Sequence, residues 1–522
     1  MKKKILTFVA LLFVGVSFVS AQSWQFVGSR AMGMGGAGVA TAYGPDAQYW
    51  NPAGLAQEDD VNETGFLINA GAQLETTKNV LEGVSNLTDM ADQYKDLKNA
   101  IDNGEAVSAE NISTIFKGLN DISKMIGKDT GAIINADGGL GFKFRNFSVS
   151  ARALGTGAIL PIVDTKNIKF NDAGAGLTLG STTTPSDTTN ATSAQKLADA
   201  ITSAGIYDAL KNLLNDTVST DSLELANAII NAAAGSATPD QIESAVDTAV
   251  SYMPGASEII SMAGSATGSY EDNETLAMAD SAVFGEVSLG YGMKVIPGLK
   301  LGANFKVISG YTAQNGVKIL EDDKKIEDII DQAKDNKKNT TNIALDLGAL
   351  VNFSELLQRD IFWNPQFGLT ARNINGPKFD RPDLPAGVDP AIAANWRTDK
   401  YQLKPQLRAG VAANPTKWMT LAADIDVTEN ETILDSIKSR QLALGAEFSL
   451  VNKQTFSIPL RVGFNKNLAQ SNMEPIYTAG IGFNMVHFYI ELAGAMSMKR
   501  ANVDGKEIPT SAGASLSLGL LF

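Results

Sequence analysis

The last nine residues of the chain, 514–522, read ASLSLGLLF. In an extended chain, successive side chains point to opposite faces, so every second residue shares a face. The leucines at 516, 518 and 520 and Phe522 therefore line one apolar face, while Ser515, Ser517 and Gly519 line the other. This alternation predicts a β-strand with one face against an apolar environment.

The same alternation recurs upstream. Between 299 and 307, for example, Leu301 and Phe305 share one face, and Lys300 and Lys306 share the other. Most of these stretches reach the roughly 9–11 residues that a tilted strand needs to cross a bilayer. Fourteen candidate strands result, at 62–76, 131–144, 146–158, 283–296, 299–311, 340–353, 361–374, 402–413, 417–427, 440–450, 455–465, 476–485, 488–498 and 514–522.

The lengths of the connections alternate. Every link from an even-numbered to an odd-numbered strand is short, as at Arg145-Asn146 and Pro297-Gly298, whereas the others are generally longer, as at 77–130 and 159–282. Short turns at one end and longer loops at the other are typical of a transmembrane β-barrel. A secreted β-sandwich, the main alternative, has no reason to alternate so regularly. The fold class predicted is therefore all-β and transmembrane, an antiparallel barrel of about 14 strands with both termini at the short-turn end.

The two ends of the chain carry export and assembly signals. Lys2 to Lys4 form a positive region, Ile5–Phe18 is apolar, and Ala21 precedes the expected cleavage site, so residues 1–21 are predicted to be a signal peptide. A membrane anchor is the alternative, but the apolar run is shorter than the roughly 20 residues that a spanning helix needs. The terminal Phe522 resembles the signal read by the barrel assembly machinery of bacterial outer membranes.

The longest connections carry helical patterns. Apolar residues recur every three or four positions within 81–125, 197–214 and 223–234, and more weakly in 319–333. Residues 181–193, rich in Ser and Thr, are predicted to form a flexible loop. Thr238-Pro239-Asp240-Gln241 has the form of a capping box with proline at the first helical position. Helical extracellular loops are thus expected at about 80–130 and 190–265, with apolar faces that pack on each other, on the barrel rim or on a ligand.

Composition excludes several classes of function. The formal net charge of −14 argues against a nucleic-acid partner. The chain has no cysteine and a single histidine, His487, so neither a thiolate nor a His-rich metal site is expected, nor a Ser-His-Asp triad away from His487. We expect no cofactor, no metal and no enzymatic activity. Asp424 and Glu447 are a conceivable carboxylate pair, but solvation of the lumen explains them more simply.

Residues 28–56 read GSRAMGMGGAGVATAYGPDAQYWNPAGLA. The glycines at 33, 35 and 38 formally match a dinucleotide-binding fingerprint, but no strand precedes them and no βαβ unit follows. The segment resembles the start of the FadL-type outer-membrane transport proteins, especially their TraF-like and PorV-like branch. The resemblance rests on Arg30-Ala31, Gly33–Gly38, Asp46-Ala47 and Asn51-Pro52-Ala53.

The resemblance implies a hatch or plug at residues 22–60 inside a fourteen-stranded barrel at 61–522. It also implies localisation in the bacterial outer membrane, uptake of hydrophobic compounds and a sideways exit through the wall. One departure is that the largest helical insertions lie here in the first two outer loops, not in the third and fourth. The partners implied are outer-membrane lipid, the assembly machinery and a hydrophobic small-molecule ligand.

Asn51-Pro52-Ala53 is the predicted contact between hatch and wall. Proline fixes its own φ and biases Asn51 towards an extended conformation, so the tripeptide forms a rigid corner. We expect the Asn51 amide to bind strand backbone left unpaired at a wall kink, and place that kink at Gly155 and Gly157 of the third strand. The alternative is a simple turn before the first strand.

Inward positions of the strands carry charges of both signs. A wide water-filled pore can hold such a set, but opposite charges that pair across the interior suit a plugged barrel better, because a buried charge is costly unless paired. The function expected is transport of hydrophobic, fatty-acid-like molecules. The alternative is a barrel that anchors or shuttles for a secretion or conjugation system. The inward charges are Glu286, Lys294, Lys300, Lys306, Asp346, Arg372, Arg408, Asp424, Asp426, Glu447, Arg461 and Glu491.

Overall fold

The structure is a computed structural model of the chain. It describes residues 23–57, 64–77, 130–169, 179–214, 216–263, 268–269, 272–318, 336–434, 436–453, 456–503 and 506–522, with residues 80, 113, 116, 117, 120 and 123. The predicted signal peptide and the helix predicted at 319–333 lie outside these residues, as does most of the helical pattern predicted within 81–125.

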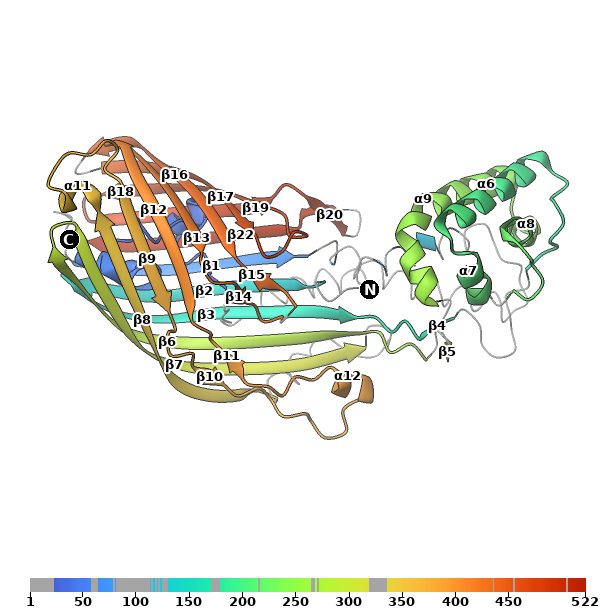
Figure 1. The fold of residues 1–522 in the computed structure, drawn as a ribbon, viewed down its shortest axis with the longest axis horizontal. Coiled ribbons are helices and arrows are strands. Elements are labelled where there is room, and N and C mark those ends of the chain that lie inside the picture. Colours follow the sequence, from blue (N-terminus) through green and yellow to red (C-terminus); the bar gives the residue numbers. More distant parts are fainter. Residues whose placement is uncertain are drawn as a thin grey trace.

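Fourteen antiparallel strands close into a barrel, as predicted (Figure 1). Consecutive wall strands pair with one another, and the last pairs with the first along Gly65–Glu75 and Ser511–Leu521. The wall strands are β1 (Thr64–Thr76), β2 (Ala132–Phe144), β3 (Phe147–Ile162), β6 (Leu276–Ile296), β7 (Leu299–Lys318), β8 (Lys338–Asn352), β9 (Gln366–Arg372), β12 (Gln406–Thr416), β13 (Met419–Asp426), β16 (Gln441–Lys453), β17 (Phe456–Asn467), β18 (Ile476–Met485), β19 (Phe488–Ser497) and β22 (Ser511–Leu521).

Strands β6 and β7 extend further than predicted, and the reason lies in their inner faces. In β6 the predicted strand starts at 283, whereas the observed one starts at Leu276. In the added stretch 276–282, lumen-facing Leu276, Met278 and Ala282 are apolar and buried, with the charged Asp280 among them. Because most of this stretch is apolar inside as well as outside, the alternation that marks a half-buried strand fades.

The barrel has a short-turn end and a long-loop end. The carboxyl terminus and the short helix α11 (Phe353–Leu356) lie at the short-turn end, on the left of Figure 1. The connections at the other end carry two-stranded sheets and a short helix. These are β4 (Asn167–Lys169) with β5 (Gly268–Ser269), β10 (Lys378–Phe379) with β11 (Tyr401–Gln402), β14 (Asn430–Glu431) with β15 (Lys438–Ser439), β20 (Arg500–Val503) with β21 (Lys506–Pro509), and α12 (Pro390–Ala394).

Apolar side chains cover the outside of the wall. Those of β7 are representative, since Leu301, Phe305 and Val307 are exposed while Lys306 is buried inside. A closed barrel pairs the backbone groups of its wall strands and leaves no sheet edge, which is what a hydrocarbon environment requires. None of the described helices is both long and apolar enough to cross a membrane.

A helical domain projects from the long-loop end (Figure 1). It consists of α6 (Thr188–Ala204), α7 (Tyr207–Leu213), α8 (Ser222–Ala233) and α9 (Pro239–Ala263). Asp187 and Asp221 cap α6 and α8 through their side chains, and Gly205 ends α6 with a φ of 66°. The predicted capping box is present, because Thr238 N donates to Gln241 Oε1 at 2.9 Å. The predicted loop at 181–193 is shorter than expected, because α6 begins at Thr188.

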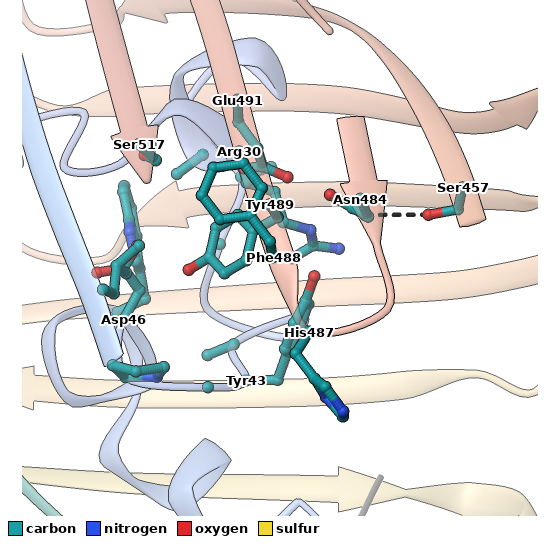
Figure 2. A pocket seen from close by; sticks show the side chains of 18 of the residues that line it. Arg30, Tyr43, Asp46, Ser457, Asn484, His487, Phe488, Tyr489, Glu491 and Ser517 are labelled. Atoms are coloured by element: carbon teal, nitrogen blue, oxygen red, sulfur yellow. Dashed lines mark hydrogen bonds between the residues drawn. The ribbon is translucent and has the colours of Figure 1, made fainter. Parts of the chain in front are cut away.

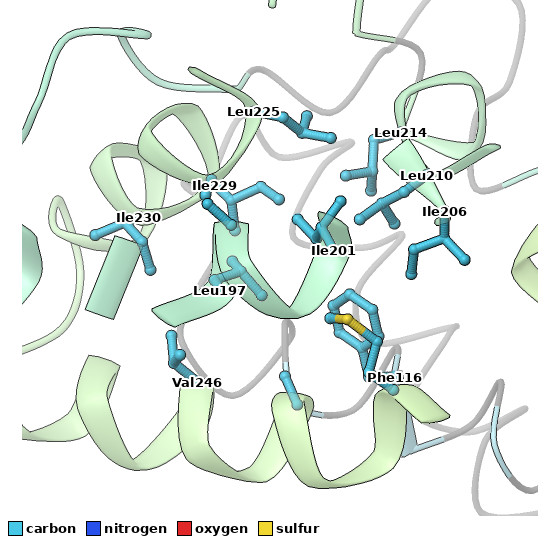
Figure 3. Close-up of a cluster of buried hydrophobic side chains, with 14 of the residues drawn as sticks. Phe116, Leu197, Ile201, Ile206, Leu210, Leu214, Leu225, Ile229, Ile230 and Val246 are labelled. Atoms are coloured by element: carbon cyan, nitrogen blue, oxygen red, sulfur yellow. The ribbon is translucent and has the colours of Figure 1, made fainter. Parts of the chain in front are cut away.

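The helices of this domain bury one common core (Figure 3). Leu197 and Ile201 of α6, Ile230 of α8 and Val246 of α9 are almost fully buried in it. Phe116, from the first long connection, packs into the same core. The apolar faces predicted in the second outer loop therefore pack on each other, and Phe116 contributes to their core from the first.

Residues 23–57 lie inside the barrel and are called here the inner segment. It contains α2 (Ser29–Gly33), α3 (Ala47–Trp50) and a 3-10 helix, η1 (Pro52–Ala56). Most of its residues are buried. Its path through the short-turn half of the lumen determines the candidate site.

Candidate functional site

Side chains of the wall strands accept hydrogen bonds from backbone N–H groups of the inner segment. Ser29 N donates to Ser517 Oγ at 2.9 Å, and Gly35 N donates to Thr478 Oγ1 at 3.0 Å. Gly38 N and Val39 N both donate to Asp424 Oδ2, at 2.8 and 2.9 Å. A segment with little regular structure can be buried only if its polar backbone finds such partners. These contacts hold the inner segment in one path.

Eight lumen-facing glycines, the glycine belt, let the inner segment approach the wall. At each position an added Cβ would come within 3.2 Å of an inner-segment atom. At Gly302 it would lie 2.2 Å from the Pro52 carbonyl carbon, and at Gly463 it would lie 2.2 Å from Gly35 N. Glycine removes that obstacle because it has no Cβ. The belt consists of Gly292, Gly302, Gly348, Gly368, Gly410, Gly445, Gly463 and Gly480, one each on β6, β7, β8, β9, β12, β16, β17 and β18. Gly141 of β2 and Gly290 of β6 lie equally close to the inner segment.

Asn51 joins the inner segment to itself and to the wall. Its Nδ2 donates to Val39 O and to Ala349 O of β8, both at 3.0 Å. Its Oδ1 accepts from Ala53 N at 3.1 Å, and its φ of −161° is extended. Pro52 follows as the first residue of η1 and lies against Gly302 and Gly348. The tripeptide is thus a corner that touches β7 and β8.

The third strand does not have the predicted role. Asn51 bonds β8, not β3. The predicted kink at Gly155 and Gly157 is wrong, because both glycines keep unbroken register with β2 and with β6. A glycine retains its backbone N–H and C=O, so it continues a ladder as long as both partners are in place. Gly155 O also accepts a bond from Gln25 Nε2 at 2.9 Å.

Phe522 lies at the short-turn end, where its backbone extends the pairing of β22 with β1. Its N–H donates to Thr64 O at 2.7 Å. Its ring stacks on His487, with centroids 4.8 Å apart. Both side chains are exposed. Its part in assembly stays a prediction.

The inward charges form buried ion pairs. Arg461 lies between Glu447 and Glu491, with N–O distances of 2.6 Å to each. Arg30 of the inner segment reaches Glu447 at 3.0 Å, so this group ties the inner segment to β16. Each carboxylate is occupied by a guanidinium, which leaves no free pair for acid–base chemistry at Glu447.

Two further ionic groups lie around the lumen. Lys306 Nζ is 3.0 Å from Asp346 Oδ1 and 3.9 Å from Glu286 Oε1. Arg408 lies 3.7 Å from Asp424 and 3.5 Å from Asp426, and all three are buried. The predicted pairing of opposite charges is therefore observed. Lys294 lies near the short turn and is exposed.

An aromatic group occupies the centre of the lumen. Trp24 stacks on Trp50 with ring centroids 6.0 Å apart, and Tyr49 meets both rings edge-on. The Arg372 guanidinium lies 4.1 Å from the centroid of Tyr49 and 4.9 Å from that of Trp24. Arg408 lies over Trp24 at 5.3 Å. Buried guanidinium groups are stabilised by contact with aromatic ring faces, because they are planar and weakly hydrated.

A cavity of about 210 Å³ lies between the inner segment and the wall at the short-turn end. Phe488 and Tyr489 lie at its centre in Figure 2, with Arg30, Asp46 and Glu491 around them. Asn484 Nδ2 donates to Ser457 Oγ at 3.0 Å on its far side. Its lining is mixed in polarity, so it can take a small molecule with both apolar and polar parts.

The long-loop half of the lumen contains an apolar cluster, which the strand pattern did not predict. Phe284 and Ile308 of the wall pack there against Phe379 and Tyr401, which the connection 373–405 brings inward. Phe284 and Phe379 have ring centroids 4.6 Å apart. Barrel interiors are usually polar. This apolar cluster comprises Ile133, Ala158, Ala282, Phe284, Ile308, Ala344, Phe379, Tyr401, Leu403, Ile433, Leu434, Ile437 and Met473.

A closed barrel with an apolar exterior and a filled lumen defines a membrane-spanning β-barrel protein. The model of the family described as the F plasmid transfer operon TraF protein matches residues 48–426. The chain belongs to this family, as the resemblance of its amino-terminal segment predicted. No curated protein matches the chain.

Solved structures similar to this chain include two toluene transporters and a FadL homologue. The toluene transporter TbuX of Ralstonia pickettii is 12% identical, with 95% of this chain and 98% of that chain covered and a TM-score of 0.42. A FadL homologue of Pseudomonas aeruginosa is 10% identical, with coverages of 97% and 99% and a TM-score of 0.40. The toluene transporter TodX of P. putida is 8% identical, with coverages of 96% and 99% and a TM-score of 0.40.

Proposed function

We propose that this protein sits in the bacterial outer membrane and admits hydrophobic small molecules, of the size of a fatty acid, through its lumen. The observation that carries the proposal is the apolar cluster in the long-loop half. An apolar solute gains by leaving water for such a region, at about 25 cal/mol per Å² of apolar surface buried. An ion or sugar would lose its hydration there without gaining partners.

The parts of the lumen follow one another along the barrel. A solute that enters at the long-loop end meets the apolar cluster first, then the aromatic residues of the inner segment around Trp24, and then the rest of that segment. The cavity beside Phe488 and Tyr489 lies beyond, at the short-turn end. We infer that the inner segment acts as a plug which shifts to let the solute pass, and that Asn51-Pro52-Ala53 sets its resting position.

The mouth of the lumen is closed by a polar layer over the apolar cluster. Arg381 of the connection 373–405 is buried and pairs with Asp280 of β6. Arg397 Nη1 donates to Ile433 O at 2.9 Å, which ties this connection to the one at 428–439. Such contacts favour a mouth that opens by moving two connections rather than the wall.

A second function, as an anchor or shuttle for a secretion or conjugation system, is supported by a different observation. The helical domain buries its own core and has only a few large apolar side chains on its surface, such as Val218 and Leu223. A domain with a separate core outside the barrel is suited to holding a partner. The family description, which refers to plasmid transfer, is consistent with this alternative.

Variants of Ile308 test the transport proposal. Ile308→Gln places an amide in the apolar cluster, where Ile308 is fully buried, and Ile308→Leu is the matched control. In a host that lacks its own fatty-acid uptake protein, we expect Ile308→Gln to reduce uptake of a long-chain fatty acid several-fold and Ile308→Leu to preserve it. The heat-modifiable, folded fraction is measured for both variants. Equal uptake by two equally folded variants would contradict the proposal.

A further inference from the structure

The lipid-facing wall has a hollow near the short-turn end. It has a volume of about 510 Å³ and is lined by Trp418, Phe448, Ser449, Leu450 and Leu460. Trp418 is 51% exposed and Leu450 is 65% exposed. The Trp418 and Phe448 rings lie side by side with centroids 6.3 Å apart. The hollow is thus an open, mostly apolar depression bounded by β13, β16 and β17.

The backbone forms this hollow through irregularities in the strand ladders. The pairing of β16 with β17 shifts register between Ser449 and Asn452. A bulge adds a residue to one strand and bends it. Pro459 of β17 has no N–H to donate, and the ladder from β17 to β18 skips from Ser457 to Leu460. Side chains on the outer face therefore spread apart instead of closing over one another.

Cations stand beside the aromatic residues at this end. Lys417 directly precedes Trp418 in the turn between β12 and β13, and it is exposed. In another short turn, the Arg145 guanidinium lies 5.7 Å from the centroid of Phe144. Arg359 is exposed in the turn that also carries Phe362, which is 81% exposed. Aromatic side chains of this kind mark the level of the lipid headgroups in a barrel.

The helical domain at the opposite end is acidic. Residues 181–263, which include it, contain ten Asp or Glu and two Lys. Exposed cations also occur at the long-loop end, as at Lys400, but those of the short turns lie next to exposed aromatic residues. Such a feature is complementary to a negatively charged headgroup, because a lysine ammonium binds phosphate as a point charge.

We propose that the hollow binds an acyl chain of an anionic phospholipid, whose phosphate lies against Lys417. The chain packs on Trp418, Phe448 and Leu450, while the headgroup stays at the level of the short turns. The site differs from the lumen in place and in ligand. It requires only that the apolar belt of the barrel lies in a bilayer, so it does not depend on the proposed transport.

Lipid retention by the full chain tests the site. The purified protein is exchanged into nanodiscs of equal phosphatidylglycerol and phosphatidylcholine, and the lipids that remain bound on release are counted by native mass spectrometry. We expect the wild type to retain phosphatidylglycerol at least threefold over phosphatidylcholine. Lys417→Gln is expected to reduce this ratio to near one. Lys400→Gln, at an exposed lysine of the long-loop end, is the matched control and is expected to leave it unchanged.

A second variant tests the acyl-chain part of the site. Leu450→Trp fills the hollow at an exposed position and is expected to lower retention of both lipids, with the folded fraction checked by heat modifiability. Equal retention of the two lipids by the wild type would overturn the proposal. A preference lost in Lys400→Gln but kept in Lys417→Gln would also overturn it. So would unchanged retention in Leu450→Trp, because the hollow would then hold no chain.

Discussion

Pro52 lies directly against Gly302, so that a Cβ on Gly302 would come 2.2 Å from the Pro52 carbonyl carbon. Gly302 of β7 pairs with Gly348 of β8, which makes room for Asn51 and Pro52 on two neighbouring strands. The corner of the inner segment and this pair of glycines are therefore complementary in shape. A Cβ at Gly302 would meet backbone atoms of Pro52 and Ala53, whereas one at Gly348 would meet the side chains of Asn51 and Pro52.

A methyl group at Gly302 should displace the inner segment. We expect Gly302→Ala to destabilise the folded barrel by about 1–3 kcal/mol, the usual cost of overpacking, and to expose the inner segment to protease. Gly157→Ala is the control, because a Cβ there meets nothing within 4 Å. Urea unfolding in detergent and limited proteolysis measure the two effects. Equal behaviour of both variants would show that the glycine belt does not position the inner segment.

Loss of Arg461 should be costly because it removes the guanidinium between two buried carboxylates and leaves Glu447 with Arg30 alone. Arg461→Met is expected to reduce the free energy of unfolding by about 3–5 kcal/mol. Lys196→Met removes one side of the exposed pair with Asp247 on the helical domain and should cost about 0–1 kcal/mol. Urea unfolding followed by tryptophan fluorescence compares them. If the two substitutions cost the same, the ionic group does not hold the inner segment in place.

The terminal aromatic residue is predicted to act during assembly. Phe522→Asp should lower the amount of heat-modifiable protein in the outer membrane, whereas Phe522→Tyr should not. A charge near the membrane interface costs only about 0–1 kcal/mol in a folded barrel. A large loss would therefore point to recognition by the assembly machinery rather than to final stability. Unchanged levels of the Asp variant would refute this role.

The orientation of the barrel follows from its two ends. We expect an epitope inserted after Thr184, before α6, to be reached by antibody on intact cells. The same epitope after Pro415, in a short turn, should be reached only after permeabilisation. The insertion sites are polar and lie near loop tips, which tolerate insertion. The reverse pattern would invert the sidedness proposed for the lumen.

The strand pattern could be predicted because one face of each wall strand meets lipid and the other a polar lumen. The long-loop end of β6, residues 276–282, could not be predicted, since Leu276 and Met278 make its inner face apolar too. Register extrapolated from the pairing of Lys453 with Phe456 at the turn would place Glu447 opposite Val462, but the shift between Ser449 and Asn452 places it opposite Arg461. The pairing of inward charges of opposite sign could thus be predicted, but not which partners meet.

The wall strands that the inner segment contacts could not be predicted from the sequence. Asn51-Pro52 could be predicted to form a rigid corner, because proline restricts its own backbone and that of the preceding residue. Which strand it touches depends on where lumen-facing glycines fall side by side after the barrel closes. A glycine in a strand is compatible with a kink, a small inner residue or a close approach. The sequence around Gly155 indicated a kink, whereas Gly302 and Gly348 allow a close approach of the inner segment.

Selective uptake by the full-length protein tests the proposed transport of hydrophobic small molecules. The protein is expressed in a host that lacks its own fatty-acid uptake protein and its general porins. Entry of a long-chain fatty acid and of a small sugar is then measured in the same cells. We expect fatty-acid uptake to rise several-fold over that of cells without the protein, and sugar entry to stay at the level of those cells. A rise in both would indicate an open pore, and a rise in neither would indicate a barrel that does not transport; either result would contradict the account.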